Sequence, residues 1–79
     1  CVDDAALMDE AGALAAQFAK GPTHAYALAK QAIHAASTNT LDEQLDLERK
    51  LQREAGQSDD YKEGVSAFLQ KRKAVFSGK

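Results

Sequence analysis

The sequence is poor in cysteine, proline and aromatic residues. It has one cysteine, one proline, no tryptophan, two tyrosines and three phenylalanines in 79 residues. The lone Cys1 excludes a disulfide framework and a cysteine-based metal site. No apolar run approaches the ~20 residues that a membrane span needs, and no segment resembles a signal peptide. These absences favour a reducing, cytoplasmic setting and no membrane partner.

Large apolar side chains are also few. The apolar content of 44% is ordinary, but alanine is its largest component. Alanine favours helices strongly and contributes little apolar area to a core. A chain this short buries only roughly 60% of its unfolded surface when it folds. We therefore expect a single helical unit whose core is completed by a neighbouring surface.

Excess positive charge is absent as well. The net charge of −2 and the pI of about 5.6 argue against general binding to nucleic acids or membrane surfaces. Lys71, Arg72 and Lys73 form a short basic run, but no aromatic platform or wider basic face accompanies it. We expect no nucleic-acid partner.

Helix signals divide the chain into four segments, at about residues 4–20, 22–36, 41–55 and 59–72. Polar residues 37–40 break the helical period and predict a loop. No segment alternates as a half-buried strand does. The predicted fold class is therefore all-α, with four helices.

The ends of the first two segments carry recognisable capping residues. Asp3 and Asp4 suit the start of the first helix, where carboxylates cap free amides and oppose the helix dipole. Gly21 suits its end, in the left-handed cap conformation. Pro22 is well placed as the first residue of the second helix.

The last two helices have clearer start signals. Thr40 and Glu43 have the spacing of a capping box, and Ser58 is a good cap for the fourth helix. Asp46 and Lys50 are predicted to form a favourable i,i+4 pair. Each of the four segments also has one apolar face at helical spacing. The larger side chains on these faces are Leu7, Leu14, Phe18, Leu28, Ile33, Leu41, Leu45, Leu47, Leu51 and Phe68.

Two charged residues fall inside apolar arcs. Glu48 lies between Leu45 and Leu51, and Arg72 projects near Phe68 on the fourth helix. One interpretation is that each extends to solvent at the rim of a small core. The other is that they meet an opposite charge, or each other, at a helix–helix or subunit contact.

The fourth segment has a strip of low bulk on one side. Asp60, Gly64, Ala67 and Lys71 share this side, which ends in a cation. A glycine inside a helix is about 1 kcal/mol less favourable than alanine, so Gly64 indicates close approach by another backbone or a ligand. The alternative is packing alone, with a neighbouring helix crossing at Gly64.

No catalytic or metal-binding pattern is present. His24 and His34 are ten residues apart and belong to no ligand motif. The acidic pairs Asp9–Glu10 and Asp59–Asp60 lie near helix ends, where capping explains them. We predict no catalytic residue and no metal ligand within this chain.

Two stretches resemble a known family. They are "LAAQFAKGPTHAYALAKQAI" and "TLDEQLDLERKLQREAGQSDDYKEGVSAFLQKRKAVFSGK". Both are similar to the C-terminal helical region of the enoyl-CoA hydratase/isomerase (crotonase) family, and the second resembles the phenylacetate-pathway isomerases of ring-epoxide CoA thioesters. The tail carries the resemblance. Its residues at the family's spacing are Ser58, Asp60, Glu63–Gly64, Ala67–Phe68, Lys71–Arg72 and Phe76.

The resemblance implies a catalytic body that this chain lacks. Family members build an oxyanion hole for a thioester enolate, and place their acid/base carboxylates, on an N-terminal β-β-α spiral. They need no tightly bound cofactor, since the coenzyme A thioester is the substrate. Their C-terminal helices cover the active site and pack subunits into trimers, often dimers of trimers.

The resemblance also implies two binding residues. Lys71 matches the lysine that reaches toward the coenzyme A nucleotide of a neighbouring subunit, and Phe68 matches a residue that helps seal the pocket or the subunit contact. Core packing is an alternative role for Phe68. Ala74 and Gln52 depart from the family, because many relatives have proline and phenylalanine at these positions.

Two functions follow from these observations. The first is the C-terminal, catalytically inactive part of an enzyme that hydrates or isomerises an unsaturated or ring-epoxide acyl-CoA. The start at Cys1 instead of methionine favours such a fragment, and we expect the fragment to self-associate. The second is a stand-alone helical interaction module. The intact mass of the source protein separates the two.

Overall fold

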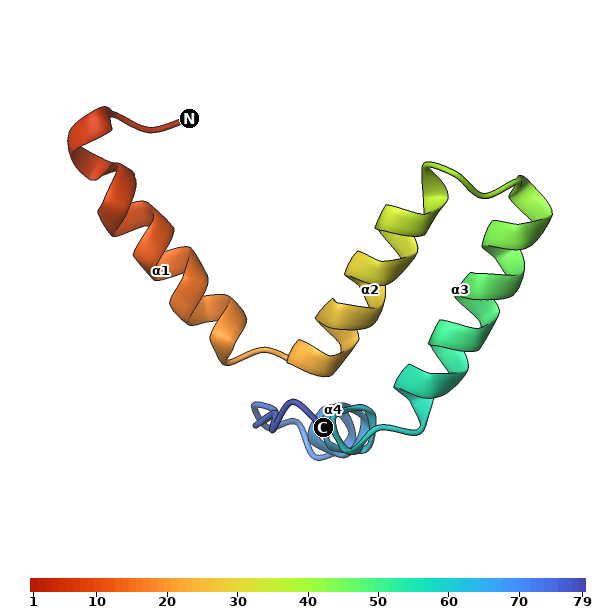
Figure 1. Cartoon of the computed structure of the whole chain (residues 1–79). Helices are drawn as coiled ribbons and strands as arrows, with labels where there is room; N and C mark the ends of the chain where they lie inside the picture. Colours follow the sequence, from red (N-terminus) through yellow and green to blue (C-terminus); the bar gives the residue numbers. More distant parts are fainter.

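The computed structural model describes residues 1–79 and is entirely helical, with no strand (Figure 1). This confirms the predicted all-α class. Its elements are the 3₁₀ turn η1 (Asp4–Ala6) and the helices α1 (Leu7–Ala19), α2 (Thr23–Ala36), α3 (Leu41–Gly56) and α4 (Asp59–Leu69). No helix is both long and apolar enough to cross a membrane.

The start signals of α3 and α4 act as the sequence predicts. The Glu43 backbone N–H donates to Thr40 Oγ1 at 3.2 Å, and the Thr40 N–H donates back to Glu43 Oε1 at 2.8 Å. These reciprocal bonds form the capping box and lower the pKa of Glu43. At the start of α4, Ser58 Oγ accepts the Tyr61 N–H at 3.1 Å.

Other boundaries differ from the prediction. The first helical residues form η1, and Asp3 makes no side-chain cap hydrogen bond. Pro22 is the N-cap of α2 instead of its first residue. The last helix ends at Leu69, so the predicted end near residue 72 is wrong. The chain leaves the helix there because Lys71 takes a left-handed conformation.

Gly21 has a packing role instead of the predicted left-handed cap. Its φ is not positive, and a Cβ at this position would collide with the Tyr26 ring. The absence of a side chain lets Tyr26 reach back over the α1–α2 connection to Phe18. The two rings meet edge to face with centroids 5.8 Å apart, a favourable arrangement for an aromatic pair.

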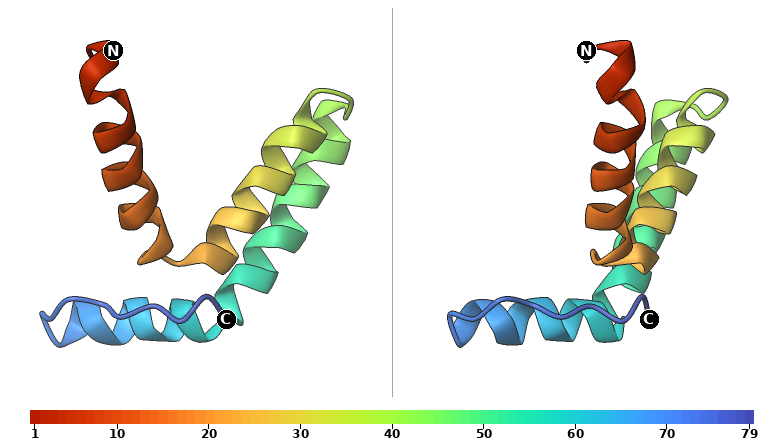
Figure 2. Two further views of the ribbon diagram at one scale, coloured as in Figure 1. Left: turned by 60° about the vertical axis from the view of Figure 1, so that its left-hand side comes forward. Right: turned by 90° about the vertical axis from the view of Figure 1, so that its left-hand side faces the viewer.

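Helices α2 and α3 form an antiparallel hairpin and lie side by side in every view (Figures 1 and 2). Leu28 and Leu51, each 8% exposed, are its buried contacts. Gln44 Nε2 donates to the Ala32 carbonyl at 3.0 Å and ties the helices together near the loop. The predicted pair of Asp46 with Lys50 is replaced by Asp46 with Arg49, at 3.4 Å on the surface.

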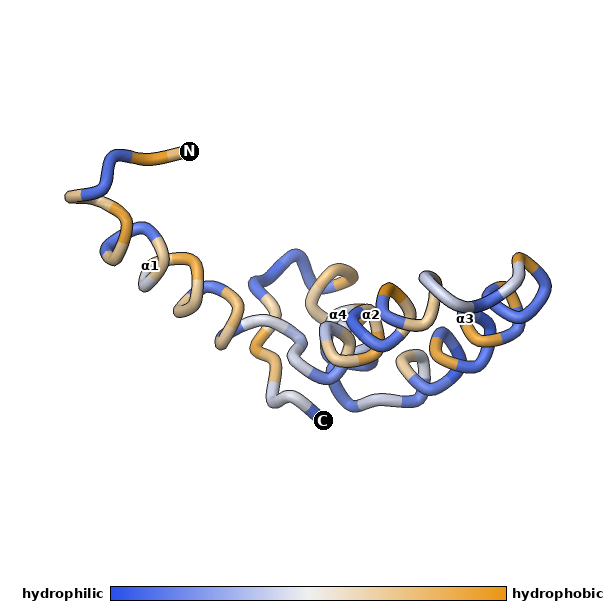
Figure 3. Tube along the Cα trace, turned by 45° about the horizontal axis from the view of Figure 1, so that its top comes forward, coloured by the Kyte–Doolittle hydropathy of each residue, from blue (hydrophilic) through white to orange (hydrophobic).

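The molecule is open instead of compact. Helix α1 diverges from the hairpin, and none of its residues is buried (Figures 2 and 3). A compact protein of 8.5 kDa exposes roughly 4,700 Å², whereas this chain exposes 6477 Å². Its radius of gyration is 15.9 Å, against about 12 Å for a compact chain of this length. The predicted apolar faces exist, but most are not covered within the chain.

Candidate functional site at the C-terminal turn

The chain reverses direction directly after α4, in the segment that carries the three consecutive cations. We call residues 70–73 the basic turn and residues 74–79 the C-terminal strap. The strap runs back along α4 (Figure 2), and its last residue, Lys79, accepts the Asp60 backbone N–H at 3.1 Å. The turn and the strap together enclose one side of α4.

The basic turn is a Schellman motif, a common way to end a helix. The Arg72 N–H donates to the Ala67 carbonyl at 3.0 Å, and the Lys71 N–H donates to the Phe68 carbonyl at 3.2 Å. Lys71 has a φ of +55° and takes the position that glycine usually occupies. A left-handed conformation costs an L-residue roughly 1–2 kcal/mol, so other contacts must hold the turn.

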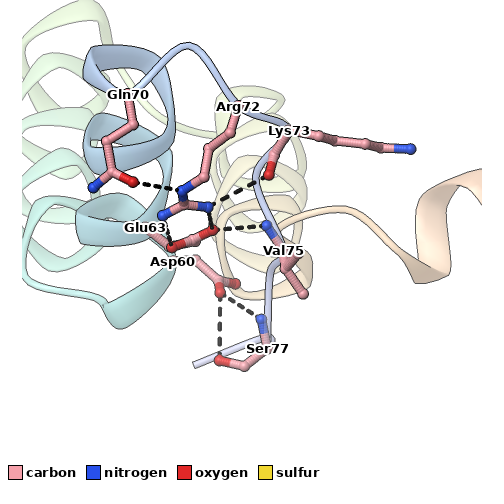
Figure 4. Close-up of polar contacts among 7 residues, drawn as sticks. All are labelled: Asp60, Glu63, Gln70, Arg72, Lys73, Val75 and Ser77. Carbon is pink, nitrogen blue, oxygen red and sulfur yellow. Dashed lines mark hydrogen bonds and ion pairs between the residues drawn. The ribbon is translucent and has the colours of Figure 1, made fainter.

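Glu63 is the main polar contact of this turn (Figure 4). Its carboxylate accepts two hydrogen bonds from the Arg72 guanidinium, at 2.6 and 2.9 Å, and a third from the Val75 N–H at 2.8 Å. The Arg72 hydrogen bond and then the Val75 N–H lower the pKa of Glu63 to about 2. The same pairing raises the pKa of Arg72. Glu63 is therefore ionised near neutral pH and joins α4 to both sides of the turn.

Asp60 anchors the strap further along (Figure 4). It is 3% exposed, and its two carboxylate oxygens accept the backbone N–H groups of Ser77 and Gly78 at 2.7 and 2.9 Å. The sequence interpretation of Asp60 as a capping residue of α4 is therefore incomplete. Its position in the first turn suits the helix dipole, but its side chain binds the end of the chain.

Gly64 and Ala67 form the low-bulk strip that the sequence predicts, and the chain covers this strip itself. A Cβ at Gly64 would lie 3.7 Å from the Phe76 ring, and Ala67 is 2% exposed. Within the chain, neither another backbone nor a helix crosses closely at Gly64: the neighbour is the Phe76 side chain of the strap, at an ordinary van der Waals distance. Lys71 does not share this side with Gly64 and Ala67, because the helix ends at Leu69.

The other candidate residues of this region are exposed. Lys71 and Lys73 form no ion pair, and the Lys73 side chain extends away from the Glu63–Arg72 pair (Figure 4). Phe68 is 82% exposed, so it does not pack in a core of this chain. Arg72 is the one cation of the turn that is held by a carboxylate.

Glu48 and Arg72 do not meet each other within the chain, although Arg72 does meet an opposite charge. Arg72 pairs with Glu63. Glu48 forms no ion pair, accepts a weak hydrogen bond from Gln44 Nε2 at 3.4 Å, and lines a groove of about 410 Å³ between α2 and α3. Gln52 lines the same groove.

No group of three histidine, cysteine, aspartate or glutamate side chains lies close enough to hold a metal ion. Cys1 is exposed and unpaired, and Asp9 and Glu10 are exposed in the first turn of α1. The polar groups that the structure does bring together are those of Asp60, Glu63 and Arg72, and all of them bind the turn and the strap.

Comparison with known proteins decides the family. The sequence profile of the enoyl-CoA hydratase/isomerase family matches residues 1–79. The chain belongs to this family. It is 60% identical over 78 residues to 1,2-epoxyphenylacetyl-CoA isomerase from Escherichia coli, which covers 99% of this chain and 30% of that protein. It is 52% identical to a Rhodobacter capsulatus protein named as a probable enoyl-CoA hydratase, over 85% of this chain and 26% of the relative.

Solved structures of the enoyl-CoA hydratase/isomerase family have the same helical arrangement. A Mycobacterium abscessus protein assigned as an enoyl-CoA hydratase/isomerase superposes with a TM-score of 0.95 at 35% identity, over 99% of this chain and 30% of that structure. The crotonase-like resemblance seen in the sequence is thus confirmed. The chain spans between 26% and 30% of the length of these relatives.

Proposed function

We propose that this chain is the C-terminal helical part of a longer enoyl-CoA hydratase/isomerase, in which it covers the catalytic body and joins subunits. The open shape carries this proposal. The accessible area of 6477 Å² exceeds that of a compact chain of this mass by roughly 1,800 Å², about twice the ~800 Å² that one partner contributes to a standard protein–protein interface. A surface of this size needs a partner, and the relatives are long enough to supply a catalytic body.

The exposed apolar residues are spread over several elements, which supports contacts with more than one surface. They occur on α1, on the hairpin, at the end of α4 and on the strap. The most exposed are Met8, Ile33, Leu41, Phe68, Leu69 and Val75. Contacts with a catalytic body and with a neighbouring subunit would together account for exposed apolar residues on these different elements. The proposed assembly is a homotrimer or a dimer of trimers.

The proposed reaction of the whole protein is hydration or isomerisation of an unsaturated or ring-epoxide acyl-CoA through a thioester enolate. The 60% identity to 1,2-epoxyphenylacetyl-CoA isomerase favours the ring-epoxide substrate. This chain supplies none of the reacting groups. The oxyanion donors and the acid/base carboxylates belong to the catalytic body.

Within this part, Lys71 is proposed to bind a phosphate of the coenzyme A nucleotide held largely by a neighbouring subunit. Two features support the assignment. Arg72 is committed to Glu63, whereas the Lys71 ammonium has no internal partner. A flexible, exposed ammonium is a good partner for phosphate. Phe68, which projects from the last turn of α4 into solvent, is proposed to seal the pocket or the subunit contact.

The full-length protein that contains this chain provides the test. We expect Phe68→Ser to shift the assembly toward smaller species in light scattering, because the substitution removes an aromatic ring from an apolar contact. Lys62→Ser is the matched control on the same helix, since Lys62 is exposed and makes no side-chain hydrogen bond or ion pair. Equal assembly of the wild-type protein and the Phe68 variant would refute the covering role of this face.

Activity is tested on the same protein. The purified full-length enzyme is assayed with an unsaturated acyl-CoA and with a ring-epoxide aryl acyl-CoA, and the 79-residue chain is assayed in parallel. We expect turnover of at least one thioester by the full-length protein and none by the chain. A full-length protein that turns over neither thioester would contradict the proposed reaction.

A further inference from the structure

Lys71 lies at a backbone position that disfavours any side chain. Its φ of +55° is left-handed, and its place in the Schellman motif normally belongs to glycine. A residue held in such a conformation depends on the structure around it, and such residues are concentrated at functional sites. The contacts that hold Lys71 in this conformation are therefore candidates for a functional role of their own.

Besides the two backbone hydrogen bonds of the Schellman motif, the contacts that hold the turn come from two carboxylates one turn apart on α4. Glu63 binds Arg72 on one side of the turn and the Val75 N–H on the other. Asp60 binds the Ser77 and Gly78 N–H groups further along the strap. Glu63 is the closer of the two to Lys71, because its guanidinium partner is the next residue in the chain.

The ion pair with Glu63 also distinguishes Arg72 from the other two cations of the turn, Lys71 and Lys73. Arg72 donates two hydrogen bonds to Glu63, one to Gln70 Oε1 at 2.9 Å and one to the Lys73 carbonyl at 3.4 Å. Its guanidinium is thus used within the turn (Figure 4). Without Glu63, Arg72 would keep only its contacts with Gln70 and Lys73 inside the turn. The backbone of Lys71 could then relax to the more favourable right-handed region.

We infer that Glu63 is a positioning residue for coenzyme A: by holding Arg72 and Val75 together, it fixes the left-handed backbone from which the Lys71 ammonium reaches a nucleotide phosphate. This inference rests on the proposed role of Lys71. It assigns to Glu63 a binding effect that acts entirely through another residue, with no contact between Glu63 and the ligand.

The test measures the dissociation constant of coenzyme A by calorimetry on the full-length protein. Lys71→Ala, Glu63→Gln and the double variant are compared with the wild-type protein. We expect each single variant to bind coenzyme A about tenfold more weakly, the effect of one hydrogen bond to a charged group. We expect the double variant to bind no more weakly than Lys71→Ala, because Glu63 acts only through Lys71. Pantetheine, which lacks the nucleotide phosphates, should bind equally to all four proteins.

Two further variants make the result specific. Arg72→Lys keeps the charge but loses the two-point contact with the carboxylate, so it should weaken coenzyme A binding in the same direction as Glu63→Gln. It also provides a second test if Glu63→Gln fails to fold. Glu54→Gln removes the same charge from an exposed site on α3 that makes no side-chain hydrogen bond or ion pair, and it should leave binding unchanged.

The outcomes separate the inference from the function on which it rests. If Lys71→Ala weakens coenzyme A binding but Glu63→Gln and Arg72→Lys do not, the positioning role of Glu63 is wrong and Lys71 keeps its role. If Lys71→Ala has no effect, the proposed phosphate contact is wrong and the inference fails with it. If the two losses add in the double variant, Glu63 acts by a route other than Lys71, which also overturns the inference.

Discussion

At the scale of single residues, Glu63 combines the strongest contacts with the largest change in acidity. Three hydrogen bonds reach its carboxylate from the turn and the strap, and they lower its pKa from an ordinary 4.5 to about 2. Because the folded pKa is lower than the unfolded one, the unfolded chain binds more protons between these values. The contribution of Glu63 to stability is therefore fully present above about pH 5 and is lost as the pH falls toward 2.

This gives a pH-dependent prediction. The difference in unfolding free energy between the wild-type protein and Glu63→Gln should be constant from pH 7 to about pH 5 and should shrink as the pH falls from 4.5 to 2. Urea unfolding of both proteins at each pH measures this difference. Since other carboxylates titrate equally in the two proteins, a difference that stays constant down to pH 2 would show that Glu63 is not paired in solution.

Gly78 is the second residue for which the structure predicts a clear effect of substitution on stability. Its φ is +81°, and a Cβ would lie 2.5 Å from Thr23 Oγ1. Gly78→Ala should destabilise the protein by roughly 1–2 kcal/mol from the backbone conformation, with a further loss from the collision. Adding Thr23→Ala to Gly78→Ala should restore only the part of the stability that the collision removes. Thermal unfolding of the two single variants and the double variant separates the two losses of stability. If Gly78→Ala leaves stability unchanged, the end of the strap does not lie against α2.

At the scale of elements, the strap depends on Asp60 more than on apolar contacts. Asp60 is buried and binds two backbone N–H groups, whereas Val75 and Ser77 of the strap are exposed. Hydrogen bonds to a charged group contribute about 1.5–3 kcal/mol each. The end of the strap is thus held mainly by the Asp60 carboxylate, whereas Glu63 holds its start at Val75.

We predict that Asp60→Ala frees the strap and destabilises it by about 2 kcal/mol or more. Trypsin should then cleave after Lys73 faster than in the wild-type protein, because the segment becomes accessible. Asp59→Ala is the matched control, since Asp59 is the adjacent acidic residue, is exposed and makes no side-chain hydrogen bond. Equal cleavage of the two variants would show that the carboxylate of Asp60 does not anchor the strap.

The α2–α3 hairpin is the other element with a buried contact. It has Leu28 and Leu51 as its buried apolar residues and a groove of about 410 Å³, half of whose eight lining residues are alanines. Two leucines contribute about 3–6 kcal/mol by burial, which is small against the entropy of ordering 30 residues of these two helices. The hairpin therefore needs covering from outside.

At the scale of the whole molecule, the chain has exposed apolar surfaces but almost no buried core. Four of 79 residues are buried. None of them lies on α1, which stands apart from the other helices except near its end (Figure 3), where Phe18 contacts Tyr26. Such surfaces are a liability in water unless a partner covers them. The proposed catalytic body and neighbouring subunit are that cover.

The isolated 79-residue chain is accordingly expected to self-associate. Light scattering of the chain over a range of concentrations should show an average mass well above 8.5 kDa, and charged substitutions at Met8 and Ile33 should reduce it. A folded monomer at high concentration would contradict the exposed faces as contact surfaces.

The amino-acid sequence by itself determined the fold class, the four helices and the clearest helix starts. Thr40, Glu43 and Ser58 act within three residues of themselves, so local spacing is enough to predict them. The family resemblance was also readable, because the tail carries it as a linear pattern. It placed Asp60 and Glu63 at the family's spacing without assigning either a role.

Only the tertiary structure decided the end of α4 and the partners of its side chains. Helical periodicity continued to Arg72, but the Schellman turn at Lys71 ends the helix at Leu69. Glu63 and Asp60 bind residues 9 to 18 positions away, a separation at which spacing along the sequence carries no information on contact. The close backbone approach expected at Gly64 was not found: its neighbour is the Phe76 side chain, at an ordinary van der Waals distance, which lies there only because the chain turns back after α4. Local hydrogen bonds follow from sequence order, whereas contacts made after a reversal depend on where the reversal occurs.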